Sequence, residues 1–524
     1  MRPTELFEAA AHHCLPLSLG LLLLLCLVLP YRGKLTLRPL TLLPGPAEWP
    51  FIGALPWLFA NHANILGALL RTTRELGFRT WTVKWLGEPR FLFITDPRNL
   101  EHVLLRNFAN YPKGENFCST LSDLLGRGIF VTDGMEWMRQ RHLYSSLFTE
   151  DTFHTTATAA LHRSGQALEA VLRASASASP PTPVDLFSLY NRFTLDTIGE
   201  VAFGVNLGTI ANPEQPFIAA FDAAQQALDQ RFFLPGWRWL KPLLPSEHRL
   251  AASIATMGAF CEQLIEARRA DPTLQQRTDV LSRAMCKELP QGSGLYPFRD
   301  STPLLKDLIM NFLIAGRDTT AQALSWATLC LASSAPELGM ADRVAAEGEQ
   351  LQGSSSSASP FAPSFEALES RLPYCSAVMQ ETLRLYPSVP KDLKTALAAD
   401  VLPDGTPVVP GTSIVYLPYV MGRCPGLWGE SAADFQPERF LGCTGAAAPS
   451  PWKLPAFNGA GPRACLGRRL ALAEANFVLA LVFSRFTLQL SPAAQGELGG
   501  CPHAESLTLP MARGLWVRVG VRGL

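Results

Sequence analysis

A single cysteine, Cys465, lies in the glycine-rich stretch "GAGPRACLG", directly before the helical pattern "RRLALAEANFVLALVF". A helix start lowers the pKa of a thiol, and a thiolate is both a nucleophile and a soft metal ligand. A nucleophilic cysteine needs a histidine base, yet the nine histidines form no local motif with it, and the closest in sequence is His503. A small buried thiol and an axial ligand to haem iron are the other interpretations. The residues alone leave these possibilities open.

Three polar residues, Asp318, Thr319 and Thr320, interrupt the apolar run "NFLIAGRDTTAQALSWA", which otherwise has the composition of a buried helix. A polar group in such a place costs free energy unless it is hydrogen-bonded. The threonine hydroxyls could donate back to the preceding helical turn. The alternative is that the polar residues take part in chemistry.

A charged pair occurs in "ETLR", where Glu381 and Arg384 lie three positions apart and can touch on one helix face. A solvated surface pair is the ordinary interpretation of such a pattern by itself. The segment "PERF", residues 437 to 440, follows and supplies a further cation, Arg439.

In their order along the chain, these elements resemble the signatures of the cytochrome P450 monooxygenases. Gly461, Arg463, Cys465 and Gly467 match the haem-binding loop of that family in order and spacing. The resemblance implies haem b as cofactor, Cys465 as the thiolate ligand of its iron, and these neighbours as cofactor-binding residues. The family places a phenylalanine seven residues before the cysteine, whereas this chain has Asn458 there and Phe457 one residue earlier.

The resemblance also assigns roles to the other elements. Glu381, Arg384 and Arg439 would form a buried structural triad. Asp318 and Thr319 would deliver protons to the reacting dioxygen, for which the small pair Ala315 and Gly316 leaves room. Upstream, "DGMEWMRQRHLYSSLF" matches a W-x-x-x-R helix with Trp137 and Arg141. Arginine forks onto carboxylates and an indole N–H donates once, so both suit a haem propionate.

The reaction that the resemblance implies is the NADPH- and O2-dependent insertion of one oxygen atom into an unactivated C–H bond of a lipophilic substrate. The sequence has no flavin or nicotinamide fingerprint, so electrons would come from a separate NADPH-cytochrome reductase. Arg468 and Arg469 would help to form its docking face. The alternatives are an O2-independent haem-thiolate isomerase or dehydratase and a non-catalytic haem sensor. The intact pair of Asp318 and Thr319 argues against both.

Three stretches further resemble the plant, algal and fungal enzymes that hydroxylate fatty acids at or near the chain end: "YPKGENFCSTLSDLLGRGIFVTDG", "AGRDTTAQALSW" and "LRLYPSVPKDLKTALAADVLPDGTPV". An apolar channel suits an alkyl chain, because each buried methylene gains ~0.8 kcal/mol. A terpenoid, sterol or carotenoid would fit such a channel equally well. The residues expected to line it are Phe117, Leu121, Leu125, Leu313 and Val389.

The elements that must position these residues are predicted to be mainly α-helical with a smaller β region, an α+β fold. Helical periodicity dominates the middle of the chain, as in "LYNRFTLDTIGEVAFG", whereas "RTWTVKWLGEPRFLFIT" and "TPVVPGTSIVYLP" have strand character. At 524 residues and 48% hydrophobic, the chain can bury a large core. The patches "ASASASPPTP" (174 to 183) and "GSSSSASPFAPS" (353 to 364) are predicted to be surface loops inside one domain.

Charge and cysteine usage exclude some classes of partner and compartment. The 45 basic residues balance 45 acidic ones, so no overall field favours nucleic acid. The eleven cysteines form no C-x-x-C pair, which fits thiols in a reducing compartment.

The N-terminus predicts a membrane anchor over residues 14 to 31, which carry no charge and reach the short end of what can span ~30 Å of hydrocarbon. A secretory signal peptide is the competing interpretation, but no small-x-small cleavage site follows. Arg32, Lys34 and Arg38 favour keeping the downstream side in the cytosol. We therefore expect a single-pass protein of the endoplasmic reticulum membrane, with residues 44 to 524 forming a cytosolic monooxygenase domain.

Overall fold

The computed structural model describes residues 43–148, 151–234, 236–286, 301–352, 359–443, 448–491 and 503–523. The predicted anchor, residues 14 to 31, lies outside these ranges. Among the residues described, no helix combines the length and the apolar character needed to cross a bilayer.

A four-stranded mixed sheet has the strand order β1-β2-β7-β4. Its strands come from two distant parts of the chain. β2 and β7 run parallel, whereas the two outer pairs are antiparallel. The strands expected from sequence are confirmed in β1 (Trp81–Val83), β2 (Phe91–Ile94) and β7 (Ser413–Tyr416), which have the β-branched and aromatic composition of strands. The sequence does not predict β4 (Asp392–Thr395), because its residues lack that composition.

Four long helices form the centre of the core. In α9 (Leu186–Phe203) and α14 (Thr302–Ser333) apolar residues occupy nearly the whole circumference, as expected for helices enclosed by protein. α17 (Pro373–Leu385) and α20 (Arg468–Arg485) pack beside α14. α9 stops at Gly204, whose φ of 61° is a left-handed conformation that glycine adopts without strain.

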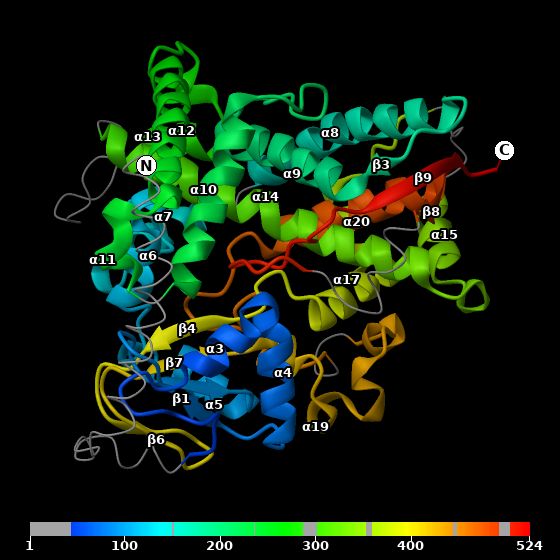
Figure 1. Cartoon of the computed structure of the whole chain (residues 1–524). Helices are drawn as coiled ribbons and strands as arrows, with labels where there is room; N and C mark the ends of the chain where they lie inside the picture. The colour runs from blue at the N-terminus through cyan, green and yellow to red at the C-terminus, as the bar shows by residue number, and fades with distance from the viewer. Residues whose placement is uncertain are drawn as a thin grey trace, which may run out of the picture.

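The other helices surround this core, and Figure 1 shows the long ones α8, α10 and α12 at the end of the molecule away from β1, β4 and β7. The α-helices are α3 (Leu55–Asn61), α4 (Ile65–Glu75), α5 (Pro97–Glu101), α6 (Glu115–Leu125), α7 (Gly134–Phe148), α8 (Asp151–Ser177), α10 (Pro216–Phe233), α11 (Trp237–Leu240), α12 (Pro245–Arg269), α13 (Val280–Cys286), α15 (Met340–Gln352), α16 (Phe365–Ser370), α18 (Pro418–Met421) and α19 (Pro425–Trp428). Short helical turns are η1 (His62–Asn64), η2 (His102–Arg106), η3 (Phe108–Asn110), η4 (Lys241–Leu243), η5 (Leu274–Gln276), η7 (Pro336–Leu338), η8 (Glu430–Ala433) and η9 (Pro437–Phe440).

Two small sheets complete the described fold. One has the order β3-β9-β8 and joins β3 (Val184–Asp185), β9 (Trp516–Val521) and β8 (Phe486–Leu490). The other pairs β5 (Asp400–Val401) with β6 (Pro407–Val408). The prediction of a mainly helical fold with a minor β component is confirmed. One loop prediction needs correction, because α8 continues to Ser177 and so includes the first four residues of the patch 174 to 183. Alanine favours helix strongly enough to carry the intervening serines.

Candidate functional site

The loop that carries Cys465 is held by its own backbone. The Cys465 N–H donates to the Phe457 carbonyl at 3.0 Å, and α20 begins three residues after the cysteine. The loop also packs closely against the end of η2, since a Cβ on Gly461 would lie 2.2 Å from the Leu104 carbonyl oxygen. Only glycine fits that position. A Cβ on Gly467 would meet only the Cys465 sulfur, at 4.0 Å, and the structure gives no steric reason for that glycine.

The Cys465 side chain has exposed surface. Burial nevertheless raises the pKa of the thiol, because protein surrounds it at longer range. The Gly467 N–H and the charges of Arg141 and Arg468 act in the opposite direction and favour the thiolate. A thiolate ligand needs both properties, an open coordination position and stabilising donors.

Helix α7 brings the predicted propionate-binding residues to this loop. The Arg141 Nη1 donates to the Ala464 carbonyl at 2.6 Å. The Arg463 guanidinium lies 4.3 Å from the centre of the Trp137 ring and donates to Asp133 at 2.6 Å. The three predicted side chains therefore lie together beside Cys465, although they come from two elements more than 300 residues apart.

Two buried lysines, which the sequence analysis did not single out, lie next to Arg463. Alternation along β4 puts Asp392 and Lys394 on one face of the strand, and Asp392 lies opposite Tyr416 of β7. Lys113 reaches both Asp392 oxygens at 3.1 Å, and Lys394 reaches Oδ2 at 3.0 Å. Lys113, Asp392, Lys394 and Arg463 are called the charge cluster below.

The charge cluster has the character of an anion site. Burial and the nearby charges of Lys113 and Arg463 lower the pKa of Lys394 to about 7. Lys113 and Lys394 hold the pKa of Asp392 well below its ordinary value, against the effect of burial. The Arg463 Nε is buried and has no hydrogen-bond partner within the described part of the chain. Three cations face two carboxylates here, Asp392 and Asp133, and this surplus of positive charge fits the carboxylates of a haem, so the residues present suit this cofactor.

One residue of the polar insert of α14, Thr319, lies on a partly open face of an otherwise buried helix. Ala315 and Thr319 are partly exposed, whereas their neighbours Asp318 and Thr320 are buried. The Thr319 hydroxyl donates back to the Ala315 carbonyl at 2.8 Å, the ordinary role of a helical threonine. Gly316 has a packing role in this structure, because a Cβ there would come within 2.5 Å of Ile198 in α9.

The Asp318 carboxyl is hydrogen-bonded by a residue from another helix. The Gln225 amide of α10 donates to it, and the Arg317 guanidinium lies 3.6 Å away. Burial raises the pKa of Asp318, and the charge of Arg317 opposes that shift. A carboxyl held this way binds a proton more readily than an exposed one. Arg317 in turn pairs at 2.6 Å with Asp222, which is largely exposed to solvent.

The structure brings the predicted triad together between α17 and η9. Glu381 and Arg384 are fully buried and make two contacts of 2.6 and 2.7 Å. The Arg439 Nε lies 3.4 Å from Glu381, a charge contact rather than a hydrogen bond.

The five predicted channel residues do not form one open surface. Leu121, Leu125 and Leu313 are almost fully buried in a single apolar cluster, and Phe117 is half-buried against it. Val389 is 37% exposed. The three leucines therefore support the wall of an apolar region, and Phe117 and Val389 are the residues with open surface.

Helix α20 also carries a buried carboxyl, Glu474, that the sequence analysis did not single out. Burial raises its pKa to about 8, against hydrogen bonds from the hydroxyls of Thr197 and Thr320. Its Oε1 has no hydrogen-bond partner among the described residues. The folded protein therefore holds a proton at Glu474 that the unfolded chain releases near pH 4.5.

We expect Glu474→Gln to flatten the pH dependence of stability. Because the folded pKa is raised, the folded state binds the extra proton between about pH 4.5 and 8, so wild-type stability falls as pH rises through that window. The slope approaches about 1.4 kcal/mol per pH unit. In urea unfolding, the free energy of unfolding of the variant relative to wild type should be higher at pH 8.0 than at pH 5.5. Glu349→Gln, at an exposed carboxyl, is the control, and an equal pH response of all three proteins would contradict the expectation.

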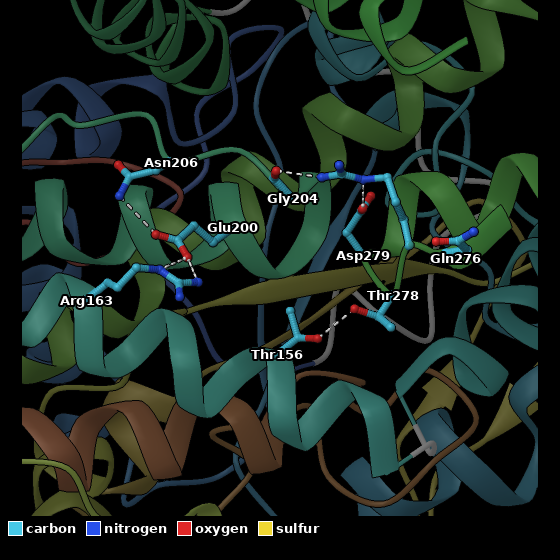
Figure 2. A pocket seen from close by; sticks show the side chains of 9 residues that line it. Thr156, Arg163, Glu200, Gly204, Asn206, Gln276, Thr278 and Asp279 are labelled. Atoms are coloured by element: carbon cyan, nitrogen blue, oxygen red, sulfur yellow. Dashed lines mark hydrogen bonds and ion pairs between the residues drawn. The ribbon is translucent and has the colours of Figure 1, made fainter. Parts of the chain in front are cut away.

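A separate polar pocket of about 380 Å³ lies between α8, the end of α9 and the segment after η5. Figure 2 shows Arg163 engaged with Glu200 in this pocket. The Arg277 Nε donates to Asp279 at 3.0 Å. None of the predicted site residues lines it. The residues that do are Thr156, Arg163, Glu200, Gly204, Asn206, Gln276, Arg277, Thr278 and Asp279.

A mainly helical fold with an enclosed cysteine and a cationic cluster beside it is the arrangement of a haem-thiolate protein. A sequence model of cytochrome P450 matches residues 43–510, and the chain belongs to this family. It is an oxidoreductase that uses haem, O2, a small-molecule substrate and a reductase partner.

Several relatives are similar over most of the chain. Cytochrome P450 monooxygenase cyp1 of Mycosarcoma maydis is 33% identical over 498 residues, which cover 92% of this chain and 76% of that protein. Cytochrome P450 704B1 of Arabidopsis thaliana is 33% identical over 527 residues, covering 91% and 95%. Cytochrome P450 86B1 of the same plant is 33% identical over 491 residues, covering 91% and 85%.

Proposed function

We propose that this P450 hydroxylates fatty acids at or near the terminal methyl group, with electrons from an NADPH-cytochrome reductase. The observation that carries the proposal is the likeness of three stretches of the chain to fatty-acid hydroxylases. These stretches contribute Phe117, Leu121 and Leu125 of α6, and Leu313 of α14 packs in the same apolar cluster. An alkyl chain gains free energy from such apolar surroundings.

Bound haem supplies the iron centre at which O2 is reduced and a C–H bond is oxygenated. In this proposal Cys465 would hold the iron, and the cations of the charge cluster, Arg141 and Trp137 would hold the haem carboxylates. Asp318 holds a proton inside the protein because burial raises the pKa of its carboxyl. Thr319 is the adjacent hydroxyl on the open face of α14 and passes that proton on. The apolar cluster around Leu313 excludes water from the region.

The substrate assignment is tested by incubating the protein, reductase and NADPH with C12 to C18 fatty acids. We expect ω- or near-ω-hydroxy acids whose formation requires both O2 and NADPH. Turnover without O2 would favour a haem-thiolate isomerase or dehydratase. Turnover of a terpenoid, sterol or carotenoid, with no fatty acid accepted, would contradict the substrate class and leave the monooxygenase class intact.

We expect Thr319→Ala to bind haem and consume NADPH while releasing several-fold more peroxide per product. The variant lacks the hydroxyl that passes the proton from Asp318 but keeps the helix. Ser325→Ala is a matched control, because Ser325 donates to the Ala321 carbonyl of α14 at 2.7 Å in the same backbone-directed manner. Equal peroxide release from wild type and both variants would remove Thr319 from proton delivery.

We further propose that residues 44 to 524 are the catalytic domain and that it faces the cytosol at the endoplasmic reticulum membrane, held by residues 14 to 31. An exposed apolar surface on the described domain supports this. Trp239 and Leu243 are each 78% exposed. This surface lies next to the N-terminal part of the domain. Gly87 is beside Trp239, and the Leu86 N–H donates to the Ile52 carbonyl. Large apolar side chains on one surface are typical of membrane contact.

In a chain lacking residues 1 to 43, we expect the double variant Trp239→Ser, Leu243→Ser to bind phosphatidylcholine vesicles several-fold more weakly. Each change removes exposed apolar area that would enter the bilayer. Vesicle sedimentation is the measurement. The control is Leu338→Ser, at an exposed leucine of η7, and an equal loss in the control would argue against a localised membrane surface.

A further inference from the structure

The loop before Cys465 contains one residue more than the family pattern, and the structure shows where that residue is accommodated. Asn458 and Gly459 both have left-handed backbones, with φ of 64° and 68°. The Phe457 carbonyl accepts the Cys465 N–H at 3.0 Å, so the additional residue is accommodated within the segment from Phe457 to Cys465. Phe457 also keeps its ring near the loop, 5.4 Å from the Arg468 guanidinium.

The Asn458 side chain bridges two parts of the site. Its Nδ2 donates to the Arg463 carbonyl at 3.0 Å, two residues before Cys465. Its Oδ1 contacts the hydroxyl of the buried Tyr416, whose single proton is donated either to Asn458 or to Asp392 at 2.6 Å. The Lys394 Nζ donates to the same hydroxyl at 3.3 Å, so a path of hydrogen bonds runs from the charge cluster to the backbone of the cysteine loop when Tyr416 donates to Asn458.

Asparagine is suited to this position for three reasons. It tolerates a positive φ better than other residues with a side chain, with the exception of aspartate. Its amide supplies a donor for the Arg463 carbonyl and an acceptor for Tyr416 at the same time. A phenylalanine would be strained at φ 64°, and it would remove the donor to the Arg463 carbonyl and one acceptor of the Tyr416 hydroxyl.

We propose that Asn458 is a positioning residue that fixes the Cys465 loop and couples it electrostatically to the charge cluster. This inference goes beyond the reaction and substrate proposed above, but it rests on the proposed role of Cys465 as iron ligand. Asn458 acts on the haem through Arg463 and the loop backbone. Its loss should therefore change the electronic properties of the bound haem as well as the stability of the loop.

The test uses two variants of the haem-loaded protein. Asn458→Gly keeps the positive φ and removes both hydrogen bonds. Asn458→Asp keeps the shape and the acceptor but sets a carboxylate oxygen against the Arg463 carbonyl. The readouts are haem content, the lifetime of the thiolate-type absorption of the reduced carbon monoxide complex, and the midpoint potential of the iron.

Both variants should bind haem and lose the thiolate-type absorption about five- to tenfold faster than wild type, since one or two net hydrogen bonds are lost. Asn458→Asp should also lower the midpoint potential, because added negative charge favours the ferric state. Asn206→Asp is the control. Asn206 also bridges backbone and side chain, since it accepts the Gly208 N–H at 2.7 Å and donates to Glu200, but it lies in the pocket of Figure 2.

The outcomes separate this inference from the assignment of Cys465. Variants with the wild-type lifetime and potential would overturn the role of Asn458 alone. A loss of folding stability with an unchanged potential would also overturn it, since Asn458 would then be only structural. A wild-type protein without the thiolate-type absorption would overturn both. If Asn458→Asp does not fold, Tyr416→Phe replaces it, because it removes the other end of the bridge and should shorten the same lifetime.

Discussion

Replacement of Cys465 by alanine is expected to abolish the thiolate-type absorption of the reduced carbon monoxide complex and all O2-dependent product formation. The alanine variant has a methyl group in place of the proposed thiolate ligand, and this loop contains no other cysteine. The open space around the thiol and the cationic residues beside it remain, so the variant should still fold. Absorption spectra and product analysis of the haem-loaded protein are the measurements.

Cys118→Ala is the matched control for this experiment. Cys118 lies close enough to the charge cluster to feel Lys113, Arg463 and Lys394, but burial raises the pKa of its thiol to about 11. It is therefore a neutral thiol at physiological pH and a poor metal ligand. The Cys118 variant should keep the absorption. If the Cys465 variant kept it instead, the assignment of the iron ligand would be wrong.

The elements of the fold that the sequence predicted well are those with a strong local pattern. Apolar periodicity placed α9, α14 and α20, and the strands β2 and β7 followed from short β-branched and aromatic runs. Helix and strand formation depend on neighbouring residues, so local patterns suffice for them. Local pattern also explains the one correction in α8, where alanines among the serines extend the helix to Ser177.

The charge cluster could not be predicted from local pattern. Lys113 and Asp392 are 279 positions apart, and only the pairing of β4 with β7 and the position of the segment before α6 bring them together. A lysine in isolation is usually a surface residue. The only sequence signal was the occurrence of Lys394 in a strand that ends up buried.

The contacts of Asp318 could not be predicted from the sequence either. The motif identified Asp318 and Thr319, but the contact with Gln225 depends on how α10 crosses α14. Gly316 illustrates the converse problem. Its small size was interpreted as space for dioxygen, whereas the structure uses it for the approach of Ile198. A motif gives the residue type, and the packing of helices decides what that residue contacts.

Glu381→Gln is expected to lower the free energy of unfolding by about 3–5 kcal/mol and to reduce haem incorporation sharply, because it leaves a buried arginine charge without its partner. Arg384 is fully buried and makes both of its carboxylate contacts with this residue. Glu381 also accepts the Gln436 N–H at 2.7 Å, which connects α17 to the segment before η9. The change therefore affects the packing behind the haem-binding loop without touching a proposed catalytic residue.

The control for this prediction is Glu369→Gln, which removes the exposed ion pair with Arg469 at 2.7 Å. An exposed pair contributes about 0–1 kcal/mol, so this variant should unfold and bind haem almost as wild type does. Urea unfolding and haem content of the two variants give the comparison.

The double variant Glu381→Leu, Arg384→Met should recover part of the loss, since it removes the uncompensated charge. Recovery stays partial because Arg384 also donates to the carbonyls of Ala432 and Asp434. If the Glu381 and Glu369 single variants were equally stable, breaking the buried ion pair would cost no more free energy of unfolding than breaking the exposed one, which would contradict the prediction.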